Sequence, residues 1–177
     1  MINCSWTDSD TIIRNPNIKL ESFLPNEKMN KIHLIAAYDY IGRKKFCCGL
    51  NTGVFFVRVH EWSLNLLMRA MSYPYFNIKK ELKLPEQISL NNILIENDES
   101  EHYIIVPPKW FNIRGGRFIS HIMGYDKNKK KYVFENLIKH LKKNQHKYNK
   151  TSNIIRTEVL KYYNLPKERQ IKIKIQP

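Results

Sequence analysis

Asp8 and Asp10 are the first residues of the chain whose type and spacing could do chemistry. They stand at positions i and i+2, where an apolar stretch that we expect to be a buried strand ends. Side chains at this spacing on an extended backbone point the same way. Two carboxylates directed into one cleft suit Mg²⁺ or Mn²⁺, which use a few carboxylates together with the phosphates of a substrate. A polar turn that caps the next segment is the competing explanation, because so short a pattern is common.

Three further segments carry polar groups that could meet a ligand. Gly53, at the start of an expected strand, would let the backbone approach a ligand closely, and Asn51 offers both a donor and an acceptor. A glycine bulge in a core strand explains the same residues. Glu86 and Gln87 begin an expected helix, where they could grip sugar hydroxyls or only complement the helix dipole. His121 ends an expected strand and could bind a divalent ion or belong to the core.

These residues need a scaffold in which strands alternate with helices. Apolar runs predict strands that end near residue 7 and that cover 32–37, 50–59, 102–106 and 118–123. Helical spacing of apolar residues predicts helices over 61–73, from 85 onward, around 134–141 and around 155–163. The segment 42–45 reads as an exposed loop, and 171–175 as an edge strand or a tail. This alternation predicts an α/β fold with a mixed sheet flanked by helices.

Length and composition exclude several classes of protein. The chain has 177 residues, of which 42% are hydrophobic, so it is neither disordered nor of low complexity. No apolar run approaches the length of a membrane span, and the N-terminal residues lack the apolar core of a signal peptide. The three cysteines have no zinc-binding spacing.

Positive charge is concentrated in the second part of the chain. Residues 1–101 hold 12 basic and 12 acidic residues, whereas 102–177 hold 18 basic and 4 acidic, which gives the whole net charge of +14. Such a segment could bind phosphate, nucleic acid or an anionic surface. A solvated, lysine-rich helix explains the same composition. The composition turns basic near residues 124–131, where we place the one expected boundary.

Taken in order, these segments resemble a known family. Residues 6–11 (WTDSDT), followed by Asn15 and Pro16, resemble the W-x-D-x-D segment of nucleotide-sugar glycosyltransferases with the GT-A fold. The order of the later motifs is typical of glycosyltransferase family 34, which holds fungal α-galactosyl- and α-1,6-mannosyltransferases and plant xylosyltransferases. These motifs are Asp39, residues 50–58 with Trp62 and Ser63, Glu86 and Gln87, Val106 and Pro107 with Asn112, and His121-x-x-Gly124. The resemblance covers about residues 5–141.

The resemblance implies a metal and diphosphate site. Asp8 and Asp10 match the D-x-D pair that holds the metal and the nucleotide, with Asp10 as the more direct ligand of Mn²⁺ (or Mg²⁺). His121 matches the histidine that completes this site. Lys127, just beyond His121-x-x-Gly124, is expected to help neutralise the diphosphate.

The resemblance also implies residues around the sugar. Asp39, Asn51 and Gly53 match the segment that faces the sugar of the nucleotide sugar. Glu86 and Gln87 match the pair near the reacting sugar, although many relatives have aspartate in place of Glu86. We therefore expect Glu86 and Gln87 to be the catalytic pair.

The activity implied is that of a metal-dependent, retaining hexosyltransferase. It would transfer galactose from UDP-galactose, or mannose from GDP-mannose, to a glycan acceptor at the lumenal face of the Golgi membrane. A transferase complex is a further candidate partner. GT-A domains place their first nucleotide-binding strands before the D-x-D pair. We therefore expect a partial GT-A fold that lacks those strands, with 1–126 as the C-terminal part of the domain and 127–177 as a basic helical extension. No membrane anchor is visible in this chain.

Two other functions compete with this interpretation. The first is a basic nucleic-acid-binding protein, which would grip phosphates with the lysines of 127–150 and stack bases on Tyr132, Phe134 and Tyr148. It explains the charge but not the acidic pair, the glycine strand or His121, so we expect no nucleic acid among the partners. The second is a catalytically inactive, transferase-like subunit, which would share the fold and differ only in activity.

Overall fold

The computed structural model describes residues 3–39, 49–77, 82, 84–144 and 150–176. Its main sheet has four strands in the order β1-β4-β3-β5, and β3 and β5 are its parallel pair. The bounds of these strands are Asn3–Thr7 for β1, Leu34–Tyr38 for β3, Leu50–Arg58 for β4 and Tyr103–Val106 for β5. A second, two-stranded antiparallel sheet joins β2 (Thr11–Ile13) to β6 (Ile119–His121).

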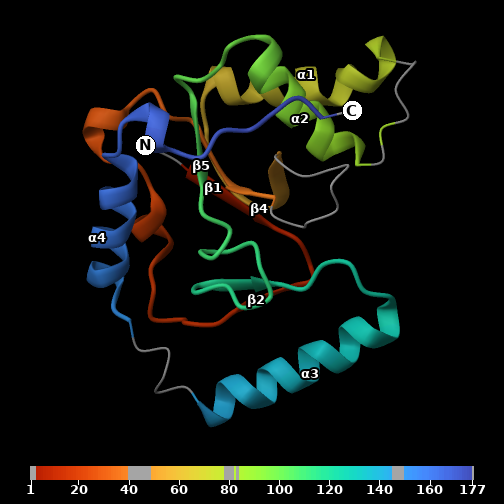
Figure 1. Ribbon diagram of the computed structural model, residues 1–177, viewed down its shortest axis with the longest axis vertical. Coiled ribbons are helices and arrows are strands. Elements are labelled where there is room, and N and C mark those ends of the chain that lie inside the picture. The colour runs from red at the N-terminus through yellow and green to blue at the C-terminus, as the bar shows by residue number, and fades with distance from the viewer. Residues whose placement is uncertain (1–2, 40–48, 78–81, 83, 145–149, 177) are drawn as a thin grey trace.

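Helices cover both faces of the main sheet (Figure 1). The α-helices are α1 (Glu61–Phe76), α2 (Pro85–Glu96), α3 (Lys127–Lys143) and α4 (Ser152–Tyr163), and short 3₁₀ helices span Leu20–Phe23, Glu27–Met29 and Lys167–Arg169. Their first residues follow ordinary capping rules: Pro85 opens α2, and the side chains of Asp126 and Thr151 accept hydrogen bonds from the first turns of α3 and α4. The predicted α/β class, a mixed sheet flanked by helices, is confirmed.

Alternation along the strands divides the interior into two cores. Leu34 and Ala36 of β3 face the core that holds α1 and α2, whereas Ile35 and Ala37 face the core that holds α4. Because β3 is buried on both faces, its sequence is a continuous apolar run and not an alternating one. Helix α4 is therefore part of the second core, and its Tyr163 hydroxyl donates to the carbonyl oxygen of Phe23 at 2.6 Å.

The C-terminal segment completes the first core as an extended tail. Residues 171–175 form no strand in the described chain, so the tail, and not the edge strand, is what the structure shows. Ile173 is buried among α1 and α2, and the side chain of Asn92 bonds both the backbone NH and the carbonyl oxygen of Gln176. The predicted boundary near residue 126 stays a prediction.

The expectation that the first strand is buried is wrong. All five residues of β1 are exposed, and Trp6 among them is 56% exposed. β1 lies at one edge of the sheet, pairs within the described residues with β4 alone and adds no residue to either core, whereas β5 at the other edge is buried. The expected loop at 42–45 lies outside the described residues.

The apolar stripe that predicts α1 also lies in solvent. Leu64, Met68 and Met71 are 62 to 76% exposed, while the side packed on the sheet carries Leu66 and Ala70. Helical periodicity shows that α1 has apolar positions on neighbouring faces, but not which face a sheet will cover. Among the described residues, no helix has both the length and the hydropathy needed to cross a bilayer.

Candidate functional site

The pairing of β2 with β6 brings Asp8, Asp10 and His121 together. Thr11 lies opposite His121 in this register, and the backbone NH of Ile122 donates to the carbonyl oxygen of Asp10 at 2.8 Å. The three side chains each offer a ligand atom, and these atoms lie within 4.8 Å of one another. His121 Nε2 is 3.1 Å from Asp10 Oδ1 and 3.6 Å from Asp8 Oδ2.

A buried asparagine orients the imidazole. His121 Nδ1 donates to Asn112 Oδ1 at 2.9 Å, and Asn112 Nδ2 donates in turn to the carbonyl oxygen of Tyr38 at 3.3 Å. Since the amide oxygen of Asn112 accepts the Nδ1 proton, Nε2 is the nitrogen presented to the carboxylates. Metal-binding histidines are commonly held by such a second hydrogen bond. The donor set of two carboxylates and one imidazole therefore fits a divalent cation such as Mn²⁺.

Gly53 provides the space that the imidazole fills. A Cβ atom at this position would lie 2.0 Å from Cε1 and 2.6 Å from Nδ1 of His121. The carbonyl oxygen of Gly53 also accepts from the backbone NH of Asp8 at 2.8 Å. Gly53 thus shapes the site from β4, and the predicted contact of Gly53 with a sugar stays a prediction.

A polar chain next to the site links the other predicted residues. Gln87 Oε1 accepts from Asn51 Nδ2 at 3.2 Å and from the backbone NH of Thr52 at 3.3 Å, while Gln87 Nε2 donates to Asp39 Oδ2 at 3.0 Å. Asp39 and Asn51 are buried, so this series of hydrogen bonds is a fixed feature of the fold. Glu86 is exposed in the first turn of α2, and its catalytic role stays a prediction.

Lys130 is a site residue that the sequence did not reveal. Its Nζ atom lies 2.5 Å from Asp10 Oδ2, and the two side chains are 34% and 16% exposed. Lys127, the predicted diphosphate residue, is exposed one turn earlier in α3. The cap at Asp126 sets where α3 begins, but only the orientation of the helix shows which lysine of the run reaches the carboxylate.

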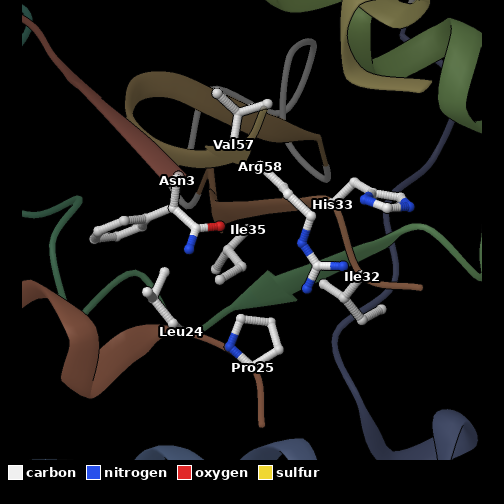
Figure 2. Close-up of a pocket in the computed structure, with 9 residues that line it drawn as sticks. Asn3, Leu24, Pro25, Ile32, His33, Ile35, Val57 and Arg58 are labelled. Atoms are coloured by element: carbon white, nitrogen blue, oxygen red, sulfur yellow. The ribbon is translucent and has the colours of Figure 1, made fainter. Parts of the chain in front are cut away.

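A second cluster of polar groups lies at the opposite end of the main sheet. Figure 2 shows Arg58 reaching toward Pro25 and Ile32 beside a cavity of about 10 Å³, room for at most one water molecule. Arg58 Nη1 donates to the carbonyl oxygen of Asn30, and burial lowers the pKa of Arg58. The size of this cavity excludes a nucleotide or a sugar.

Three histidines stack beside this cavity. The ring of His33 lies 4.1 Å from that of His60 and 5.4 Å from that of His102, and Trp62 packs against both His33 and His102. The pKa of His33 is lowered from 6.5 to about 4, mainly by burial and also by the charges of His60, Arg58 and His102. The buried Nδ1 atom of His33 has no hydrogen-bond partner in the described chain.

The stacked histidines predict a loss of stability in mild acid. As the pH falls from 6.5 to 4, the unfolded chain takes up a proton that folded His33 does not bind, so the free energy of unfolding decreases. The decrease attributable to His33 is roughly 2 to 3 kcal/mol at pH 4. Urea unfolding of the His33→Phe variant between pH 7 and 4 should show this part of the decrease removed. The exposed His140→Phe variant is the control, and a pH dependence equal in wild type and His33→Phe would contradict the assignment.

Comparison with known proteins shows a likeness of fold. No protein-family profile and no curated protein match the chain. Among solved structures it is similar to the crystal structure of a glycosyltransferase involved in the glycosylation of the major capsid of PBCV-1, with a TM-score of 0.57 and 17% sequence identity. The likeness covers 75% of this chain, which spans only 66% of the length of that protein. The chain therefore has a glycosyltransferase-like fold, and the likeness is not to family 34 in particular.

Proposed function

We propose that this chain is a metal-dependent glycosyltransferase, or a large part of one, that transfers a sugar from a nucleotide sugar to a glycan acceptor. The observation that carries the proposal is the convergence of Asp8, Asp10 and His121 on a glycosyltransferase-like fold. A fold by itself hosts many functions, and the site gives the specific argument. Two carboxylates and an oriented imidazole suit a cation that binds the phosphates of a nucleotide sugar.

Each part of the site has a task in such a reaction. Asp8, Asp10 and His121 would hold the divalent ion, whose chemistry is to stabilise negative charge on the departing diphosphate. Asn112 keeps the imidazole turned toward the carboxylates. The hydrogen-bonded side chains of Asp39, Asn51 and Gln87 present fixed amide and carboxylate groups, which can hold sugar hydroxyls in one orientation.

The finer assignment rests on the resemblance to glycosyltransferase family 34. We infer from it that the metal is Mn²⁺, the donor UDP-galactose or GDP-mannose, and the transfer retaining. The same resemblance supports Glu86 and Gln87 as the pair near the reacting sugar, Lys127 near the diphosphate, and a place at the lumenal face of the Golgi membrane, alone or in a transferase complex. It also supports 1–126 as the C-terminal part of the transferase domain and 127–177 as its basic extension.

A donor screen tests the proposal. The purified chain should release UDP from UDP-galactose or GDP from GDP-mannose when Mn²⁺ is present and not when EDTA replaces it. Without the metal, the two carboxylates of the triad of Asp8, Asp10 and His121 would repel the diphosphate. Equilibrium binding of both donors, with Mn²⁺ and with EDTA, gives a second readout. The double variant Lys142→Gln/Lys143→Gln, at the exposed end of α3, should behave as wild type. If the chain neither releases a nucleoside diphosphate nor binds any donor in a metal-dependent way, the proposed activity is rejected.

A further inference from the structure

The two oxygens of the Asp10 carboxylate have different partners. Oδ1 lies 3.1 Å from His121 Nε2, whereas Oδ2 lies 2.5 Å from Lys130 Nζ. Because both Asp10 and Lys130 are partly buried, this ion pair is screened less than one at the surface. Lys130 therefore places a positive charge directly beside the oxygen atoms that a divalent ion would use.

Lys130 also connects α3 to the site. None of the described side chains of α3 is buried, and Figure 1 shows the helix apart from the main sheet, beyond β2. The Asp126 cap fixes the first turn of α3, because its carboxylate accepts from the backbone NH groups of Asn128 and Lys129 at 3.0 Å. The cap thus fixes the rotation of the first turn of α3 about the helix axis, and in this rotation Lys130 points toward Asp10.

We propose that Lys130 couples metal binding to anion binding at this site, an inference that rests on the proposed function. The triad has two carboxylates, Asp8 and Asp10, and the ammonium group of Lys130 repels a divalent cation that binds there without an anion. A diphosphate that arrives with the metal reverses this effect, since Lys130 then faces negative oxygens. The site consequently binds the metal weakly by itself and binds metal and diphosphate together tightly.

The chain offers a matched pair of variants. Lys130→Met keeps an unbranched side chain and removes the charge beside Asp10. Lys131→Met removes the same charge from an exposed position of the same helix, the residue directly after Lys130. Because no described residue of α3 is buried, both variants should fold, and thermal unfolding in EDTA checks that they do.

Two dissociation constants measure the coupling, with inorganic pyrophosphate as the probe. Electron paramagnetic resonance of free Mn²⁺ gives the affinity for the metal alone, and calorimetry at saturating Mn²⁺ gives the affinity for pyrophosphate. Relative to wild type, Lys130→Met should bind Mn²⁺ alone about tenfold more tightly and pyrophosphate about tenfold more weakly, within the usual range of coupling between sites. Lys131→Met should match wild type in both, and Lys130→Arg should retain most of the coupling.

Each other result counts against the proposal. If Lys130→Met binds Mn²⁺ no more tightly than wild type, or if Lys131→Met shifts both constants as much, Lys130 does not couple the two ligands although the metal site stands. If wild type binds no Mn²⁺ with or without pyrophosphate, the metal site fails, and the proposed function fails with it.

Discussion

The Asp10→Asn variant is expected to lose most of the stabilisation that Mn²⁺ and a diphosphate give to the wild-type chain. A ligand at 100 times its dissociation constant stabilises a folded protein by about 2.7 kcal/mol. Asparagine keeps the shape of Asp10 but has no negative charge for the metal. The stabilisation by Mn²⁺ and a diphosphate should therefore fall to a small fraction of the wild-type value. Metal-dependent release of the nucleoside diphosphate should fall with it, by a factor of roughly 10² to 10³, the scale of losing one electrostatic stabiliser of developing charge.

Asp10→Asn should also destabilise the metal-free chain slightly. The substitution removes the negative partner of Lys130, and a partly buried ion pair is worth on the order of 1 kcal/mol. Thermal unfolding with and without Mn²⁺ and pyrophosphate separates the two effects. The Lys142→Gln variant, whose side chain lies at the exposed end of α3, is the control and should keep the full ligand-dependent shift. An Asp10→Asn protein with an undiminished shift would remove Asp10 from the metal site.

The sequence predicts the members of the triad better than it predicts what holds them. Asp8 and Asp10 are recognisable because their spacing places two carboxylates on one side of an extended backbone. His121 lies more than a hundred residues away from Asp8 and Asp10. In the sequence, only the order of motifs that resembles a known family connects His121 with the two carboxylates. The contact itself depends on the pairing of β2 with β6, two three-residue strands whose register no local pattern specifies.

The partners of the triad could not be predicted for a similar reason. Asn112 lies in a loop, and its hydrogen bond to His121 requires the three-dimensional course of that loop. Lys130 is one of four lysines among residues 127–131, and the sequence carries no signal for which of them faces Asp10. The exposure of β1 and of one apolar side of α1 depends on which surfaces the rest of the fold covers, and periodicity does not encode this.

A methyl group at position 53 is expected to have the largest structural effect of any single substitution at the site. The Cβ atom of Gly53→Ala would lie 2.0 Å from His121 Cε1, far inside van der Waals contact. His121 is buried and fixed by Asn112, so the ring cannot turn aside without breaking its 2.9 Å hydrogen bond. Overpacking costs about 1 to 3 kcal/mol and an unsatisfied buried polar group a similar amount. We expect Gly53→Ala to destabilise the chain by roughly 2 to 4 kcal/mol and to abolish Mn²⁺ binding.

Two further variants test the cause of this loss by urea unfolding and Mn²⁺ titration. In Gly115→Ala the new Cβ would meet its nearest atom, Arg14 Nη1, at an ordinary 3.8 Å, so stability and metal binding should change little. In the double variant Gly53→Ala/His121→Ala the ring that collides with the methyl group is gone. If the collision is the cause, Gly53→Ala should cost much less stability in the His121→Ala background than in wild type, a coupling that exceeds about 1 kcal/mol. Equal costs in both backgrounds would mean that Gly53 is required by the β4 backbone and not by the imidazole it faces.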